Sequence, residues 1–207
     1  MLPTIKIEIP PLTVEGEPEN GSPGNHELQL ICALAYWRHC RSIFEFGTFR
    51  GRTVSHLARH VEQARIYTLD LPAGVTHGLF SRPGDDYFSL LRQDSLFVSG
   101  HPRITVLYGD SATFDFHPYL GLMDFVWVDA AHSYAACLAD SLRALTLLAP
   151  GGMIAWHDYA NSTEREVSEA LEDLQRHSSL FAGLRHVVGT TVVFLNTAPR
   201  VTGYDEY

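Results

Sequence analysis

Lysine is almost absent from this sequence: Lys6 is the only one, and the other basic residues are arginines. Acidic residues outnumber basic ones, which gives a formal net charge of -9. Because binding to a phosphate backbone needs a basic face, we expect no nucleic-acid partner. No apolar run is long enough to span a bilayer, and the acidic, proline-containing N-terminus is unlike a signal peptide. We therefore expect a cytoplasmic protein with no membrane contact.

Cysteine is scarce as well. Cys32, Cys40 and Cys137 form no Cys-x-x-Cys pair and leave an odd count, so a reduced, intracellular chain is the simplest interpretation. Two catalytic patterns are missing: the Gly-x-Ser-x-Gly elbow of serine hydrolases and the Gly-x-x-x-x-Gly-Lys-Ser/Thr phosphate loop. His56 and His60 have the spacing of a metalloprotease, but the glutamate that such a site needs is absent between them.

The order of the apolar runs predicts the fold. The chain has 207 residues, 45% of them hydrophobic, which is enough for one domain with a full core. Strands are expected over 42–46, 66–69, 104–108, 125–128 and 153–156, helices over 26–39, 53–61, 134–148 and 163–177, and a hairpin over 184–188 and 191–195. Strands that alternate with helices form a parallel sheet with right-handed crossovers. We predict a doubly wound, Rossmann-like α/β fold whose seven strands are mostly parallel, with an antiparallel C-terminal strand.

Two segments depart from this alternation. Residues 1–25 are rich in Pro, Gly and Glu, and we expect an arm that either packs on another subunit of a homo-oligomer or stays mobile. The single domain then extends over residues 26–207. Residues 72–100 are interrupted by prolines and glycines, with a helix expected over 86–98. A long connection of this kind is often a functional lid, so we expect it to border the substrate.

The chain is organised around residues 43–53, an apolar strand followed by a glycine turn and a helix. The pattern is Glu-x-Gly-x-x-x-Gly rather than the dinucleotide fingerprint Gly-x-Gly-x-x-Gly, and Phe49 stands where the middle glycine would be. Asp70 ends the next strand, about twenty residues later, where a carboxylate can accept hydrogen bonds from both hydroxyls of a ribose. The same residues also fit any tight strand-to-helix turn, and a ribose acid occurs in NAD-binding folds too.

Residues 43–53 resemble the first motif of class I S-adenosylmethionine-dependent methyltransferases, in the variant of the catechol O-methyltransferase-like and small-molecule and sugar O-methyltransferases (methyltransferase family 24). The resemblance runs from about residue 28 to 196. Its most specific parts are residues 129–134, 147–152 and 157–159. It implies the fold predicted above, S-adenosylmethionine as cofactor, and a small-molecule methyl acceptor.

The resemblance also implies roles for individual residues. The methionine part of the cofactor lies along Glu45, Gly47 and Thr48, and Thr53 binds its carboxylate at the helix start. Asp70 takes the ribose, and the turn at Asp110 and Ser111 takes the adenine. The remaining residues that the resemblance places at the cofactor are Gly51, Leu71 and Asp129.

At the reaction centre, the resembling enzymes often hold Mg²⁺, and the matching residues are Asp129, His157 and Asp158. The His-Asp pair departs from their usual oxygen ligands, since imidazole suits transition metals better than Mg²⁺. The alternative is that His157 and Asp158 are hydrogen-bonded loop residues. His132 stands where the catechol-type enzymes carry a lysine base, and a histidine can accept a proton near neutral pH. Its alternative role is to anchor the turn before the next helix.

The resemblance therefore favours a methyltransferase that uses S-adenosylmethionine on the hydroxyl of a small molecule, with Asp129 and His132 as catalytic residues. Versions with and without a divalent metal, Mg²⁺ or a transition metal, both stay open. One rival is an NAD-dependent oxidoreductase, against which Phe49 and the terminal hairpin argue. The other is a non-catalytic module that binds S-adenosylmethionine.

Overall fold

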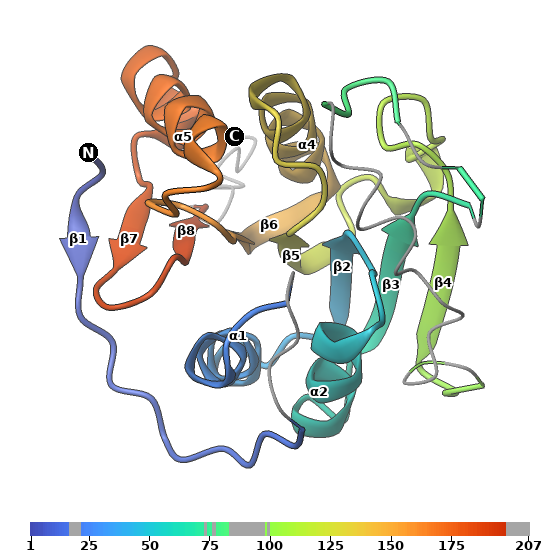
Figure 1. The fold of residues 1–207 in the computed structure, drawn as a ribbon. Coiled ribbons are helices and arrows are strands. Elements are labelled where there is room, and N and C mark those ends of the chain that lie inside the picture. The colour runs from blue at the N-terminus through green and yellow to red at the C-terminus, as the bar shows by residue number, and fades with distance from the viewer. Residues whose placement is uncertain (17–21, 73, 76–77, 83–97, 99, 198–207) are drawn as a thin grey trace, which may run out of the picture.

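A mixed sheet of eight strands forms the centre of the molecule in the computed structural model, which describes residues 1–16, 22–72, 74–75, 78–82, 98 and 100–197 (Figure 1). The strand order is β1-β7-β8-β6-β5-β2-β3-β4. The strands are β1 (Thr4–Ile5), β2 (Ser42–Phe46), β3 (Arg65–Asp70), β4 (Ile104–Tyr108), β5 (Met123–Val128), β6 (Leu148–Trp156), β7 (Arg185–Val187) and β8 (Val193–Asn196). The α-helices are α1 (Asn25–Trp37), α2 (Arg52–His60), α4 (Tyr134–Leu147) and α5 (Arg165–His177), and short 3-10 helices cover His117–Tyr119 and Ser179–Phe181.

Helices cover both faces of the sheet: α1 and α2 lie on one face, and α4 and α5 lie on the other (Figure 1). Alternate residues of a strand point to opposite faces, so one strand supplies both cores. In β2, Phe44 and Phe46 join the core beneath α4 and α5, whereas Ile43 joins the core beneath α1 and α2. Both faces are therefore buried, which explains why the central strands are continuous apolar runs.

The predicted Rossmann-like α/β fold is confirmed, with one correction to the strand count. Strands β2, β3, β4, β5 and β6 pair in parallel, and β8 runs antiparallel to both β6 and β7, as predicted for the closing hairpin. The sheet has eight strands rather than seven because Thr4–Ile5 pairs with the edge strand β7. A strand of two residues is too short to show a periodic pattern in the sequence. Here the strand forms because its backbone pairs with the free edge of β7. The helix expected over 86–98 lies outside the described residues, apart from Val98, which is in a turn.

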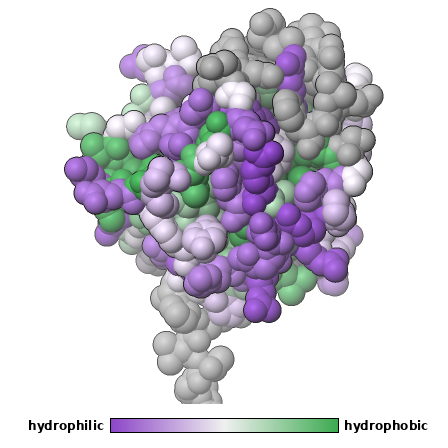
Figure 2. Space-filling view, turned by 90° about the horizontal axis from the view of Figure 1, so that it is seen from below, coloured by the Kyte–Doolittle hydropathy of each residue, from purple (hydrophilic) through white to green (hydrophobic). Residues whose placement is uncertain are grey.

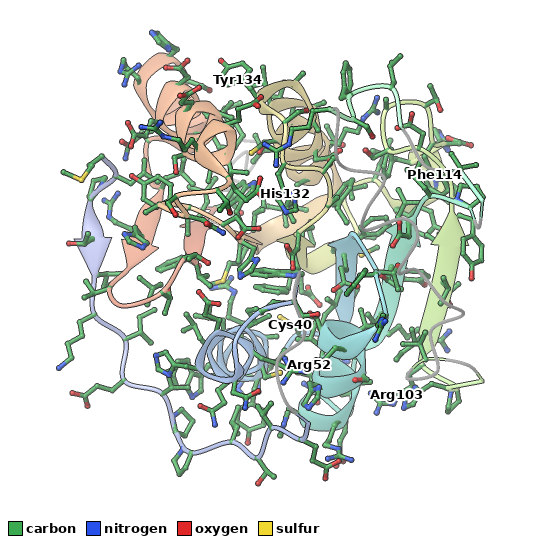
Figure 3. All side chains as sticks on the ribbon, viewed as in Figure 1. Cys40, Arg52, Arg103, Phe114, His132 and Tyr134 are labelled. Atoms are coloured by element: carbon green, nitrogen blue, oxygen red, sulfur yellow. The ribbon has the colours of Figure 1, made fainter. Side chains whose placement is uncertain are left out.

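The N-terminal arm lies along the surface of its own domain. The backbone N–H of Leu2 donates to the Tyr159 hydroxyl at 2.8 Å, and four partly buried apolar residues further along pack against the α1 and α2 core: Ile7, Ile9, Leu12 and Val14. Arg52, at the start of α2, reaches back and donates to the carbonyl of Pro23 at 2.8 Å (Figure 3). The expectation that the arm is either mobile or packed on another subunit thus missed these contacts within the chain.

One face of the molecule is mostly hydrophilic. Seen from the side of α1 and α2, it carries its hydrophobic residues in small groups (Figure 2). Within the described part of the chain, every helix is too short or too polar to cross a membrane.

The aromatic group under α4 and α5 should contribute strongly to stability. Phe44 is fully buried, and its ring lies 5.1 Å from Phe46 and 5.6 Å from Tyr119, centroid to centroid. Phe44→Ala should lower the free energy of unfolding by about 3–5 kcal/mol, since it removes buried apolar surface and leaves a cavity. Urea denaturation measures this. Leu180→Ala, at a side chain 67% exposed, is the matched control and should change it by about 0.5 kcal/mol or less; equal effects would contradict the packing.

Candidate functional site

A cleft opens at the carboxyl ends of β2, β3, β4 and β5, where an open α/β sheet binds its ligands. Its empty volume is about 960 Å³, including the part open to solvent, which is enough for a ligand of nucleoside size. Its described lining comprises Phe46, Gly47, Phe49, Leu69, Asp70, Leu71, Gly78, Phe80, Ser81, Gly109, Asp110, Ser111, Asp129, Ala130, Ala131, His132 and Ala136.

The glycine turn after β2 forms one wall of this cleft through a very close backbone approach. Gly47 has φ +92°, and a Cβ atom there would lie 2.0 Å from the carbonyl oxygen of Asp129, so no other residue fits. Phe49 also adopts a left-handed conformation, φ +48°, which is uncommon for a bulky residue. Its backbone N–H donates to Asp70 Oδ2 at 2.7 Å. The turn therefore takes the shape that glycine would favour at position 49, although a side chain is present.

Two aspartates present acceptor oxygens to the cleft. Asp70 is oriented by the N–H groups of Phe49 and Leu71, each at 2.7 Å. Asp110 accepts from the N–H of Ala112 at 2.9 Å and from that of Leu79 at 2.6 Å. An ionised carboxylate has about four lone-pair sites, so both residues keep acceptor capacity for hydroxyl or amino groups of a ligand. Two carboxylates that backbone N–H groups hold in place, with apolar side chains lining the cleft around them, fit an adenosine group.

Asp129 and His132 line the other end of the cleft, and His157 and Asp158 lie beside them in a compact group of acids and histidines. Asp129 and His132 follow β5, and His157 and Asp158 follow β6. Nε2 of His132 lies 3.0 Å from Asp158 Oδ2, and Nδ1 of His157 lies 3.2 Å from both Asp129 Oδ1 and Asp158 Oδ2. Figure 3 shows His132 near the ends of these strands, below α4. The predicted residues therefore converge at one edge of the sheet.

The acids and histidines of this group stabilise one another's charged forms. Burial opposes the charged form of His132, but the hydrogen bond and charge of Asp158 outweigh it and raise the pKa of His132. For His157 the same opposition is overcome by Asp129, Asp158 and Glu27, which raise its pKa well above the ordinary range. Burial alone would raise the pKa of Asp158, yet the two histidines hold it well below its usual value. Asp158 also has φ +62°, a strained conformation of the kind that clusters at functional sites.

The same group offers ligands for a cation. Asp129, His132 and Asp158 each present one ligand atom, and these atoms all lie within 4.8 Å of one another. Two carboxylates and an imidazole suit a transition metal better than Mg²⁺. This set contains His132, which was expected to be the base. A metal and a proton would compete for its nitrogen, because a histidine ligand must be neutral.

Glu27 connects this end of the cleft to helix α1. Its Oε2 lies 3.2 Å from Nε2 of His157, and its Oε1 accepts from the N–H of Thr191 at 2.6 Å and from its hydroxyl at 2.8 Å. Burial would raise its pKa, but the His157 and Thr191 hydrogen bonds lower it to about 2. Glu27 does not stand out in the sequence, since an acid in the first turn of a helix is common for electrostatic reasons alone.

The residues expected at the cofactor fall into two groups. Those that line the cleft are Gly47, Asp70, Leu71, Asp110, Ser111 and Asp129. Those outside the described lining are Glu45, Thr48, Gly51 and Thr53. Glu45 is 1% exposed and accepts from the Thr68 hydroxyl at 2.5 Å, while Thr48 lies 2.6 Å from the same hydroxyl. Burial raises the pKa of Glu45 well above its ordinary value, and its hydrogen bond with Thr68 ties β2 to β3.

The segment expected as a lid borders the cleft where it is described. Gly78, Phe80 and Ser81 are part of the lining. The Ser133 hydroxyl donates to the Phe80 carbonyl at 2.6 Å, and Arg82 forms an ion pair with Glu164, ahead of α5. These contacts hold residues 78–82 against the domain.

The lowered pKa of Glu27 predicts a pH-dependent contribution to stability. Its stabilisation is present above the ordinary pKa of 4.5 and is lost as the pH falls toward about 2. Glu27→Gln should therefore lower the free energy of unfolding at pH 6 by about 2 kcal/mol, allowing for solvent screening, and by less at pH 3. Urea denaturation at both pH values tests this. Glu62→Gln, at an exposed position, is the control; a pH-independent loss in Glu27→Gln would contradict the ionic role.

Solved structures with the same fold support the architecture. The cofactor-bound structure of Rv0187 from MTB is 20% identical, with a TM-score of 0.55 over 90% of this chain and 82% of that one. TomG, an O-methyltransferase from Streptomyces achromogenes solved with SAM, is 22% identical, with a TM-score of 0.52 over 84% of this chain and 80% of that one. SAH-bound PaMTH1, a methyltransferase of Podospora anserina, is 15% identical, with a TM-score of 0.59 over 86% and 80%. At these identities the likeness concerns the fold.

No curated protein matches the chain in sequence. A family described as "Methyltransferase domain" matches residues 44–159, which is more than half of the chain. This segment extends from the strand before the Gly47 turn, through Asp129 and His132, to the pair His157 and Asp158. The chain belongs to this methyltransferase family.

Proposed function

We propose that the protein transfers a methyl group from S-adenosylmethionine to a hydroxyl of a small molecule. The observation that carries this proposal is a cleft with oriented carboxylates at one end and Asp129 and His132 at the other, where Asp158 lies beside them. The solved relatives support the cofactor, since TomG is an O-methyltransferase in complex with SAM and PaMTH1 is bound to SAH. The domain over residues 26–207 would carry the activity.

The cofactor would lie along the strand ends, with its sulfonium near Asp129. When bound, S-adenosylmethionine supplies a methyl group that is already activated for transfer. Asp70 would accept from the ribose hydroxyls, and Asp110 and Ser111 would bind the adenine. The Gly47 turn lets backbone lie against the ligand, and Phe46, Leu69 and Leu71 line the cleft with apolar surface. The protein's task is then to align the acceptor oxygen with the methyl group and to exclude water.

The acceptor's proton would pass to His132. Asp158 lies 3.0 Å from Nε2 of His132, so a neutral His132 would keep the proton on Nε2 and the lone pair on Nδ1. As the new bond between oxygen and methyl carbon forms and the sulfur–carbon bond breaks, Nδ1 takes the hydroxyl proton. The raised pKa of His132 makes it a stronger base but leaves less of it neutral at pH 7.

A metal-assisted version of the same reaction has its own support in the clustered ligand atoms. Asp129 and Asp158 would hold a divalent ion together with His132 or His157. An ion there would lower the pKa of the acceptor hydroxyl by stabilising its anion. Glu27 would then accept from the other ring nitrogen of His157, an arrangement common for metal-bound histidine.

The cofactor assignment predicts tight binding that depends on Asp70. A charged hydrogen bond contributes roughly 1.5–3 kcal/mol, so Asp70→Ala should weaken binding of S-adenosylmethionine and its demethylated product by about tenfold or more. Calorimetry measures both ligands and NAD. Glu169→Ala, exposed on α5, is the control. Unchanged affinity in Asp70→Ala, or a preference of the native protein for NAD, would sink the assignment.

The base assignment predicts a loss of turnover without loss of donor binding. His132→Ala should lower kcat by about 10²–10⁴-fold, because a positioned base contributes that much, while calorimetric donor affinity stays intact. In the native protein, kcat/KM should rise with pH to a plateau above the ordinary histidine pKa near 6.5, because the neutral form of His132 is the active one. Methylation of a panel of hydroxylated metabolites, followed by mass spectrometry, provides the assay. Exposed His177→Ala is the control.

Chelation separates the two versions of the reaction. If EDTA abolishes turnover and a divalent ion restores it, the metal-assisted version holds. Full activity in EDTA together with full activity of Asp158→Asn would show that the metal version is wrong. Full activity of His132→Ala would remove the base assignment as well.

A further inference from the structure

Asp140 is a buried acid that neither the cofactor assignment nor the acceptor chemistry uses. It lies on α4, its side chain is 1% exposed, and among the described residues its Oδ1 has no hydrogen-bond partner. Leaving a buried polar atom unpaired costs free energy comparable to a lost hydrogen bond. An acid that keeps such an oxygen on the buried face of a helix calls for a partner that the protein alone does not supply.

The surroundings of Asp140 place it behind the wall of the cleft near Ser111. Burial raises the pKa of Asp140 to about 7, against the opposing effects of a Ser111 hydrogen bond and the charge of Arg143. Ser111 lines the cleft, and so does Ala136, which is one helical turn before Asp140. Side chains on a helix lean toward its N-terminus, so the Asp140 carboxyl extends from its own turn toward Ala136 and the cleft.

An ion pair with Arg143 does not account for the buried acid. Arg143 donates from Nη2 to the carbonyl of Ala112 at 2.6 Å, and no ion pair joins it to Asp140 in the part of the chain that the structure describes. The carbonyl it holds belongs to the turn that contains Asp110 and Ser111. Helix α4 therefore supports this turn with Arg143 and places a carboxyl behind it with Asp140.

We propose that Asp140 makes the cleft selective for a purine that carries a 6-amino group. This inference rests on the proposed function, in which adenine binds at Asp110 and Ser111. An exocyclic amino group donates two hydrogen bonds, and Asp140, directly or through the Ser111 hydroxyl, supplies an acceptor. A 6-oxo purine presents a lone pair instead, which a carboxylate repels. The buried acid thus distinguishes adenosine from inosine.

Calorimetry with two ligands tests the proposal: S-adenosylhomocysteine, and S-inosylhomocysteine, in which a 6-oxo group replaces the 6-amino group. The native protein should prefer the adenosyl compound by about tenfold or more, the effect of one charge-assisted hydrogen bond. In Asp140→Asn the preference should fall severalfold, because an amide both accepts and donates. Asp115→Asn, at an exposed position, should keep the native preference.

A second measurement needs no variant. A neutral carboxyl can donate to a 6-oxo group, so the preference of the native protein should be smaller at pH 6 than at pH 8. The titratable groups that influence Asp140 are Arg143, Asp110 and Cys137, and burial raises the pKa of the Cys137 thiol to about 12. The thiol therefore stays neutral over this range.

The outcomes are distinguishable. If the native protein binds both compounds equally, or if Asp140→Asn keeps the full preference, Asp140 is not the selecting residue although the proposed function stands. If neither compound binds, the proposed function fails and this inference fails with it. Should Asp140→Asn not fold, a preference that is equal at pH 6 and pH 8 would by itself overturn the proposal.

Discussion

The structure depends most on one electrostatic arrangement: two histidines compensate the charge of two carboxylates at the ends of adjacent strands. Asp129 and Asp158 follow paired residues, Val128 of β5 and Trp156 of β6, so the sheet itself brings them together. Both lie within 3.2 Å of Nδ1 of one histidine, His157. Breaking a buried ion pair by removing one partner typically costs about 3–5 kcal/mol, because it leaves a charge uncompensated. The histidines are therefore structural as well as chemical parts of the site.

The same compensation links distant parts of the chain to the reaction end. Glu27 on α1 contacts His157 on one side and Thr191, before β8, on the other. Asp129 adds a second link, because its carbonyl oxygen lies against Gly47 while its carboxylate faces His157. A shift of the glycine turn would thus disturb the acids at the other end of the cleft. The glycine turn and the group of acids and histidines are therefore coupled through Asp129.

The sequence predicted the elements whose signal is local. Continuous apolar runs mark the buried parallel strands, and acids or glycines after them mark the cleft edge, so Asp70, Asp110 and Asp129 could be placed without coordinates. Strand β1 could not, because two residues have no period and its pairing comes from β7. Glu27 was missed because its partners are far away in sequence. Asp140 did leave a signal: it lies among the small, buried residues Cys137, Ser141 and Ala144 of one helix face, a place where an acid is costly.

Environment, more than residue type, decides what each acid of this molecule can do. Glu45 belongs to the motif that identified the turn, yet it is buried outside the described lining of the cleft, and burial raises its pKa well above the ordinary value. Glu27 has the opposite environment, with donors on both oxygens, and stays ionised. Burial raises the pKa of Asp140 to about 7, where a ligand's hydrogen bond can decide its protonation state. The three acids, on β2, α1 and α4, thus differ in pKa because their surroundings differ.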